Sequence, residues 1–391
     1  MKFAHLSDCH IGGWREDTLR DVNLKSFEKA IDICVEQHVG FVIIAGDLFD
    51  TALPSIDILK QTARILSKLK DYDIPVYLIP GSHDFSASGK TMLDVLENAG
   101  LVTNVMKINE NKLEFTIDRT GVKLTGMYGR KGGLEVFDYS KIDMQELERE
   151  EGFKIFLFHT LLEELKPGQF ELMKCPSISI LPKGFNYYAG GHPHFVYSKY
   201  HSNYGIVSYP GPLYPNNFQE LEDLKSGGFF IVDVKNNSLD VKHIPLKVVD
   251  VVSYSINADG KSPREVEDLI LNTVRDYEGK ILTLRIEGCL KEGKISDISF
   301  KNLFENFKDA YFILKNTNKL ITKEFTEVRV EDGTVDAVEN SIIKENIKGS
   351  MFDEDKISNL ISSLDKDKFD GEKNADFELR IIKEVESLLN L

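Results

Sequence analysis

The chain has few of the features that mark secreted or membrane proteins. Its 391 residues include only four cysteines, which stand far apart and form no CxxC pair. This usage indicates neither a disulfide framework nor a zinc knuckle, and it suits a reducing cytoplasm. No stretch approaches the roughly 18 uncharged apolar residues of a membrane span, so we expect no transmembrane or secretory segment.

Nucleotide-binding fingerprints and a basic patch are also absent from the sequence. There is no P-loop and no Gly-rich dinucleotide motif, so ATP hydrolysis by this chain itself is not expected. The formal net charge is −15, whereas DNA binding usually needs a basic face. Residues 321–391 hold 18 acidic and 10 basic side chains, which supplies −8 of that charge. DNA binding by the remainder therefore stays open, because bound divalent metals would add positive charge.

Acidic and imidazole groups, by contrast, gather in five short segments at the ends of β-type runs. These segments hold five of the nine histidines. They are Asp8-Cys9-His10, Gly46-Asp47, Gly81-Ser82-His83-Asp84, His159, and Gly190-Gly191-His192-Pro193-His194. Random scatter would rarely give this arrangement, which suits a two-metal phosphoesterase.

The spacing inside the first and last segments predicts paired ligands. Residues two apart in an extended chain point to the same side. Asp8 with His10, and His192 with His194, would each present two donors to one cavity. Either pair alone is more often a turn carboxylate or a surface histidine, so only the five segments together favour a metal centre.

Asp47 is a candidate bridging ligand. It lies just beyond residues 41–45, which read as a buried parallel strand, and open α/β sheets build their sites at such carboxyl ends. Carboxylates with neutral imidazoles suit Mn²⁺, Fe²⁺ or Zn²⁺. Two such ions about 3.5–4 Å apart can polarise a phosphate and generate hydroxide, so a phosphodiester is the natural substrate.

The other four histidines are not expected in the site. His5 alternates with apolar residues of the first strand and is predicted to be a hydrogen-bonded core residue. His38, His201 and His243 are predicted to be loop or surface residues.

Four stretches, FAHLSDCHIGG, VIIAGDLFD, IPVYLIPGSHD and YYAGGHPH, resemble the calcineurin-like metallophosphoesterases. In particular they resemble the SbcD nuclease family, which is called the meiotic-recombination-eleven nuclease in archaea and eukaryotes. The resemblance implies a Mn-dependent exonuclease and endonuclease with two divalent metal ions. It would act on DNA ends in double-strand-break repair, as a homodimer, with an SMC-like ATPase of the SbcC type. A cytoplasmic and, in a prokaryote, nucleoid-associated location would follow.

The resemblance also implies a role for each site residue. The metal ligands would be Asp8, His10 and His194 for the first ion, Asp47 as the bridge, and His159 and His192 for the second. Ser82 stands where the family has an asparagine ligand of the second ion, and its shorter neutral hydroxyl would reach that ion through a water. His83 would contact the phosphate and assist the leaving oxygen, with Asp84 orienting its ring. Some relatives have a further histidine where this chain has Asp50, so His83 would act alone.

The chain is expected to be α/β: a metallophosphoesterase sandwich of two mixed β-sheets flanked by helices, with a small α/β cap domain and a helical C-terminal tail. The expected elements are strands at 2–7, 41–45 and 75–79, a helix over 54–70, and a hairpin of 113–117 with 122–127. The expected domains are a nuclease domain at 1–245, a cap at 246–320, and an acidic linker with amphipathic helices at 321–391.

The cap and the tail each allow two interpretations. The cap, with strand-like 248–255 and 281–286, would contact DNA or serve only as an accessory domain. The tail has helical periodicity around 357–364 and 377–389, joined by a solvated linker at 365–371. Such helices cannot bury their apolar faces alone, so they need the body of the protein or a partner, and the resemblance implies the ATPase.

Three functions remain in competition on sequence grounds. The first is the DNA nuclease subunit. The second is a phosphodiesterase acting on a small molecule such as a cyclic nucleotide, or a phosphoprotein phosphatase, although the residues after 245 count against both. The third is a non-catalytic scaffold in which Ser82 has weakened the second metal site.

Overall fold

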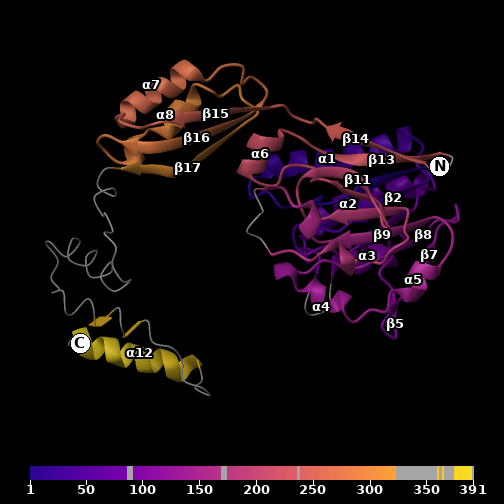
Figure 1. Cartoon of the computed structure of the whole chain (residues 1–391). Helices are drawn as coiled ribbons and strands as arrows, with labels where there is room; N and C mark the ends of the chain where they lie inside the picture. The colour runs from indigo at the N-terminus through magenta and orange to yellow at the C-terminus, as the bar shows by residue number, and fades with distance from the viewer. Residues whose placement is uncertain are drawn as a thin grey trace. The chain divides into compact units, whose positions relative to one another are not determined.

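A computed structural model describes residues 1–85, 91–168, 174–235, 238–322, 359–360, 363–364 and 374–389 (Figure 1). Two six-stranded sheets dominate these residues. The first has the order β14 (Ser238–Leu246), β13 (Gly227–Lys235), β1 (Lys2–Leu6), β2 (Phe41–Ala45), β3 (Val76–Ile79) and β4 (Thr103–Asn104). The second has the order β11 (Val196–His201), β12 (Gly205–Pro210), β10 (Tyr187–Gly191), β9 (Lys154–His159), β8 (Lys123–Gly126) and β7 (Thr116–Ile117).

Both sheets are mixed, as the sequence predicts. Strands β1, β2, β3 and β4 run parallel to one another, while β13 and β14 pair antiparallel. In the second sheet β8, β9, β10 and β12 are parallel, with β7 and β11 antiparallel at the edges. The predicted hairpin is confirmed in the β7–β8 pair, and a further short pair joins β5 (Ile108–Asn109) to β6 (Lys112–Leu113).

Strand β2 shows why these runs fold between two layers. All five of its side chains are buried. Val42 and Ile44 pack in a cluster with α1 (Asp17–Glu36), α2 (Ile56–Asp71) and α3 (Met92–Asn98), whereas Phe41 and Ile43 pack with side chains of the second sheet. Because alternate residues face opposite sides, a strand covered on both faces reads as one apolar run.

Further helices lie in the described residues. They are α4 (Glu135–Tyr139), α5 (Gln145–Arg149), α6 (Phe218–Leu224), α7 (Pro263–Thr273), α8 (Phe300–Glu305) and α12 (Asn374–Leu389). A three-stranded sheet, β15 (Val251–Asn257), β16 (Ile281–Leu290) and β17 (Phe312–Thr322), follows the sandwich in sequence. Among the described helices, none is long and apolar enough to cross a membrane.

The chain divides into two compact units. The first comprises residues 1–257, 267–287 and 299–319, and the second comprises 258–266, 288–298 and 320–391. The domain boundaries expected at 245 and 320 stay predictions. Helix α12 confirms the second tail helix, and residues 359–360 and 363–364 of the first are helical. The linker predicted at 365–371 lies outside the described residues.

Candidate metal centre

The five segments singled out in the sequence meet in space. They follow β1, β2 and β3 of the first sheet and β9 and β10 of the second, at the carboxyl end of each strand. Three groups of nearby ligand atoms result among the described residues: Asp8, His10 and His194; Asp8, Asp47 and His159; and His10, Asp50 and His83. The convergence predicted from the sequence is therefore present.

The backbone reaches this arrangement by a route that the sequence did not predict. The paired residues were expected to be extended, yet Asp8, His10 and His192 have φ values of 50°, 43° and 94°. Hydrogen bonds from the Asp8 amide to Gly46 O (3.2 Å) and from the His10 amide to Asp47 O (3.0 Å) hold the first turn. Such sparsely populated conformations persist where their surroundings determine them, and they gather at functional sites.

The first group brings the Nε2 atoms of two imidazoles together. The Nε2 atoms of His10 and His194 lie 3.1 Å apart, and His194 Nε2 is 3.7 Å from Asp8 Oδ1. His194 Nδ1 is 2.9 Å from Glu220 Oε1, so an Nδ1–H donated to this carboxylate leaves Nε2 free to bind an ion. Two ring nitrogens and a carboxylate oxygen that point to one place are the donor set a cation requires.

The second group surrounds His159. Its Nε2 is 3.0 Å from Asp47 Oδ2 and 4.0 Å from Asp8 Oδ1, and it makes no hydrogen bond with the described residues. Nδ1 lies 2.8 Å from Ala45 O, and donation to this carbonyl turns the Nε2 lone pair toward the carboxylates. Gly46 permits this approach, because its φ is 86° and a Cβ there would lie 2.2 Å from His159 Nδ1.

Asp47 lies between the groups. Its Oδ2 is 3.8 Å from His10 Nε2 as well as 3.0 Å from His159 Nε2, and its Oδ1 accepts the amide of His83 at 2.7 Å. Ser82 Oγ donates to Asp47 Oδ2 at 3.3 Å. The structure thus places Ser82 beside the predicted bridge.

His192 has a different setting. Its amide donates to both Asp8 oxygens, at 3.0 and 3.1 Å, and its ring packs against His159 with the centroids 5.3 Å apart. Its ring belongs to none of the three donor groups found among the described residues. The backbone of His192 therefore orients Asp8, independently of whether its ring binds a metal ion.

His83 is held by a backbone carbonyl rather than by the carboxylate expected from the sequence. Its Nδ1 lies 2.7 Å from Asp50 O, and about a third of its side chain is exposed. Asp84 instead accepts the amides of Leu48 and Phe49 at 3.0 Å each and that of Gly81 at 3.1 Å. The role predicted for Asp84 is thus wrong: its buried carboxylate ties the loop after β2 to the loop after β3.

The buried carboxylates of the centre favour positive charge on the groups beside them. Burial tends to raise the pKa of Asp47, but His159 and His10 hold it well below its usual range. Burial opposes protonation of His159, yet Asp47 and Asp8 raise its pKa to about 10. Burial and the neighbouring His159 lower the pKa of His192 to about 4. A cation bound by these donors would supply the charge that the His159 proton otherwise provides.

The sequence did not predict two carboxylates that contact histidines of the centre. Asp50 Oδ1 lies 3.2 Å from His10 Nδ1, although its position was considered only as a missing histidine. Burial tends to raise the pKa of Glu220, but its contact with His194 holds that pKa below the usual range. Asn217 three residues before Glu220 is a helix-start signal, since Asn217 Oδ1 accepts the Glu220 amide, but this signal does not predict the contact with His194.

The histidines left out of the site lie elsewhere. His5 is fully buried, with Nδ1 2.9 Å from Tyr187 Oη, so its predicted core role is confirmed. His38 is exposed at the end of α1. His201 and His243 lie half-buried in β11 and β14 rather than in loops.

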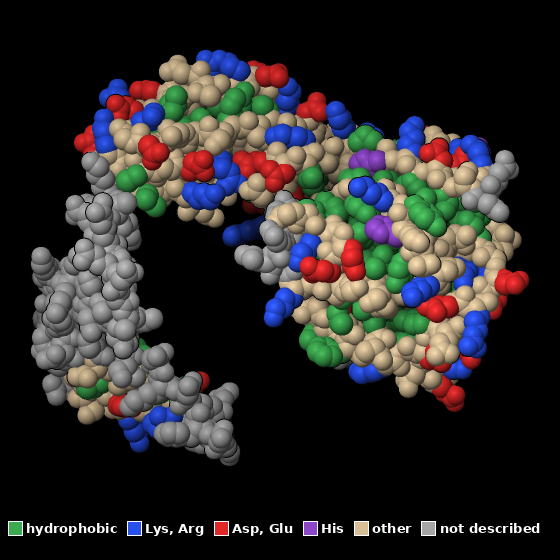
Figure 2. Space-filling model, in the orientation of Figure 1, with side chains coloured by type: hydrophobic (Ala, Val, Ile, Leu, Met, Phe, Trp, Pro, Cys, Tyr) green, Lys and Arg blue, Asp and Glu red, His purple; other side chains and the backbone are tan. Residues whose placement is uncertain are grey.

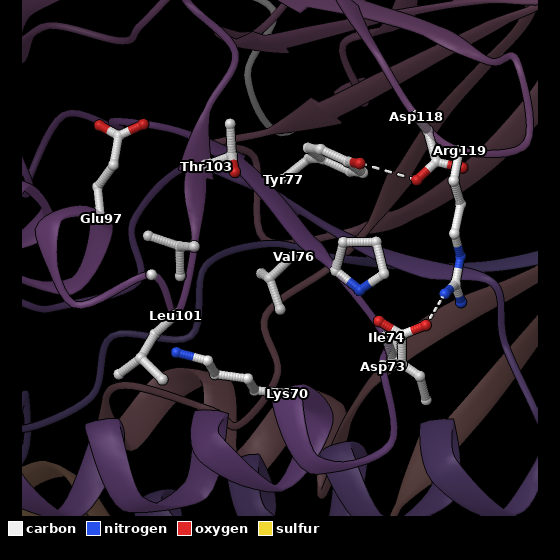
Figure 3. Close-up of a pocket in the computed structure, with 13 residues that line it drawn as sticks. Lys70, Asp73, Ile74, Val76, Tyr77, Glu97, Leu101, Thr103, Asp118 and Arg119 are labelled. Atoms are coloured by element: carbon white, nitrogen blue, oxygen red, sulfur yellow. Dashed lines mark hydrogen bonds and ion pairs between the residues drawn. The ribbon is translucent and has the colours of Figure 1, made fainter.

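A separate hollow of about 440 Å³ opens at the amino end of β3, the end opposite the metal centre (Figure 3). Two pairs of polar side chains line it: Tyr77 Oη donates to Asp118 at 2.8 Å, and Arg119 forms an ion pair with Asp73. These four side chains are thus paired within the protein, and the hollow contains none of the residues of the metal centre.

The fold and the grouped metal donors are those of a metal-dependent phosphoesterase, and comparison with known proteins agrees. Residues 1–196 match the calcineurin-like phosphoesterase family, to which the chain belongs. Within it, the chain is a member of the Mre11/SbcD nuclease family.

Two relatives show the extent of the similarity. The DNA double-strand break repair protein Mre11 of Sulfolobus acidocaldarius is 26% identical, over 94% of this chain and 95% of that protein. The protein of the same name from Thermoplasma acidophilum is 30% identical, over 75% and 79%. Among solved structures, a dimetal phosphatase from Danio rerio is 12% identical, covers 63% of this chain and 98% of its own, and has a TM-score of 0.41.

Proposed function

We propose that this protein is a dinuclear-metal nuclease that hydrolyses phosphodiester bonds at DNA ends during double-strand-break repair. The observation that carries the proposal is the convergence of His10, His194 and His159 Nε2 atoms with the Asp8 and Asp47 carboxylates. Family membership supports the substrate, because the relatives are named for DNA double-strand break repair.

The donor set fits two divalent ions, for which we propose manganese. Asp8, His10 and His194 would hold the first, Asp47 would bridge, and His159 and His192 would hold the second, with Ser82 contributing through water. Such ions polarise the phosphate and lower the pKa of bound water. His192 is the proposed ligand with the least support from the geometry, because its ring belongs to none of the three donor groups.

His83 is proposed as the catalytic group that contacts the phosphate. Its Nδ1–H donates to Asp50 O, which fixes the ring and leaves Nε2 for the substrate. Its greater exposure suits this role, because the ligands His10 and His159 are almost fully buried. The protonated ring would stabilise the leaving oxygen and donate a proton to it.

The first test is degradation of linear DNA in Mn²⁺ and in Mg²⁺ by the natural protein and by Ser82→Asn. A hydroxyl that reaches the second ion through water binds it weakly, so the natural protein should need more Mn²⁺ for half-maximal activity than Ser82→Asn. The two should give the same products. Ser67→Asn, at a half-buried position of α2 that contributes no proposed ligand, serves as the matched control and should leave the half-saturation unchanged.

Absence of DNA cleavage in both proteins at every Mn²⁺ concentration, with the partner supplied, would overturn the nuclease proposal. It would favour the scaffold, which needs no full complement of two ions. Cleavage of a cyclic nucleotide but not of DNA would favour the small-molecule phosphodiesterase.

The C-terminal tail is proposed to bind an SMC-like ATPase of the SbcC type. Helix α12 is amphipathic, yet Leu379 and Ile382 are 54% and 53% exposed, so apolar surface is left for a partner. Deleting residues from 350 onward should leave hydrolysis of a simple phosphodiester within about twofold, because no proposed ligand is lost. Co-purification with the ATPase should disappear; a truncated protein that still binds it would place the docking surface elsewhere.

The homodimer, the DNA contact of the cap and the nucleoid-associated location also remain proposals. Apolar side chains are available for a dimer contact at Ile56, which is 83% exposed, and at Val95. The Met92 amide donates to Ala52 O at 3.1 Å, which brings the beginning of α3 beside the loop before α2. A monomer mass by light scattering at micromolar concentration would contradict the dimer.

On the face of the molecule in Figure 2, Lys and Arg side chains are interspersed with Asp and Glu. That face therefore offers DNA no broad basic surface. Protection of DNA phosphates by the cap residues in footprinting would support a contact there, and its absence would leave the cap an accessory domain.

A further inference from the structure

Helix α6 touches the metal centre through one carboxylate. Glu220 Oε1 lies 2.9 Å from His194 Nδ1, and its Oε2 accepts the Asn216 amide at 2.8 Å. Asn217 Nδ2 donates to Oε1 at 2.6 Å. Both oxygens are therefore fixed, and the position of α6 sets the direction in which the His194 ring points.

Arg285 in β16 also binds the same helix, through side chains other than Glu220. Arg285 Nε donates to both oxygens of Glu222, at 3.3 and 3.0 Å, and its Nη2 contacts the same carboxylate and donates to Gln219 Oε1 at 2.7 Å. The guanidinium also lies 5.2 Å from the centroid of the Phe218 ring. Fork-like contacts of this kind restrict geometry more than a single ion pair does.

The ion pair is shielded from solvent. Only 15% of the Arg285 side chain and 12% of the Glu222 side chain are exposed. Leu221 of α6 and Ile281 of β16 are fully buried in one cluster with Trp14 and Tyr214. All of these residues belong to the first compact unit. Helix α6 and β16 are thus joined by both apolar packing and a directional polar contact.

Gln219, Glu220 and Glu222 occupy a helix of seven residues. Over so short a length, a helix moves as one rigid piece, so a shift that relaxes the Arg285 contact also displaces Glu220. We propose that Arg285 is a positioning residue that acts through α6 and Glu220 to aim His194 at the first metal ion. This rests on the proposed function, and it means that the β15–β16–β17 sheet sets the affinity of the first metal site.

The test is a two-step titration of the full-length protein with Co²⁺. Calorimetry and the visible absorption of the bound ion measure each step. His192→Gln first identifies the step that belongs to the second site. Glu220→Gln should weaken the first-site step about 10–100-fold, the usual effect of losing a partner that orients a metal ligand. Arg285→Gln should weaken it less, on the order of three- to tenfold, and change the absorption spectrum, with the second step unchanged.

Two further variants separate positioning from general stability. Arg285→Lys keeps the charge but loses the fork, so it should fall between the natural protein and Arg285→Gln. Exchanging the partners, as Arg285→Glu with Glu222→Arg, should restore most of the affinity. Lys291→Gln is the matched control, since it breaks an ion pair just after β16 that involves Glu265 rather than α6.

An unchanged first step in Arg285→Gln, or equal weakening in Lys291→Gln, would overturn this inference while leaving the nuclease proposal intact. An exchange variant that binds as weakly as Arg285→Gln would likewise overturn it. A natural protein that takes up no ion would instead overturn the proposed function itself.

Discussion

Asp47→Ala should bind neither metal ion tightly and should lose DNA cleavage. Asp47 Oδ2 lies 3.0 Å from His159 Nε2 and 3.8 Å from His10 Nε2, so this one carboxylate serves the donors of both proposed sites. Its removal leaves two incomplete sets of ligands. The loss of affinity should exceed the roughly 10–100-fold that follows removal of a group that only supports a ligand. Metal content after dialysis, measured by mass spectrometry, gives the result.

Asp118→Asn is the matched control for Asp47→Ala. Asp118 is also a buried carboxylate, but it accepts the Tyr77 hydroxyl and the Thr120 amide at the opposite end of β3. The control should melt at a lower temperature and still hold both ions. Two tightly bound ions in Asp47→Ala would show that the bridge is a different residue, and Asp8, which is shared by two donor groups, would be the next candidate.

His83→Leu should reduce the turnover of DNA cleavage by about 10²–10⁴-fold while both ions remain bound. The ring is anchored through Nδ1 to Asp50 O, and about a third of the side chain is exposed, so it can meet a phosphate without serving as a ligand. Leucine fills a similar volume but cannot exchange a proton. Single-turnover rates at saturating Mn²⁺ separate this chemical effect from weaker DNA binding.

His38→Leu is the control for His83→Leu, because it removes an exposed histidine at the end of α1 and should leave turnover unchanged. Two results would contradict the role of His83. Loss of an ion would make it a ligand, in agreement with the group that it forms with His10 and Asp50. Unchanged turnover with both ions bound would exclude it from the mechanism.

Much of the fold could be predicted because its signals are local. The β2 run was placed at residues 41–45, as observed, and α2 was expected at 54–70 and begins and ends within two residues of that range. The mixed sandwich is confirmed as well. Continuous apolar runs indicate strands covered on both faces, and helical spacing of apolar residues indicates the helices that cover them.

The residues of the site were predicted more completely than their geometry. Asp8, His10, Asp47, His159 and His194 do come together. The extended conformation assumed for the pairs was wrong, because Asp8, His10 and His192 have positive φ values imposed by neighbouring loops. Asp84 was assigned to His83, whereas its carboxylate accepts amides of the loop after β2, which lies 35 and 36 residues earlier in the chain.

The types of ligand and the strand ends from which they project could be read from the chain alone, since each depends on a few neighbouring residues. Which donors face one another, and what orients them, became known only from the folded structure. His194 meets Glu220 from 26 residues away, and Arg285 meets Glu222 from 63 residues away. Contacts between such distant residues depend on how whole elements pack, and no local pattern in the chain specifies that packing.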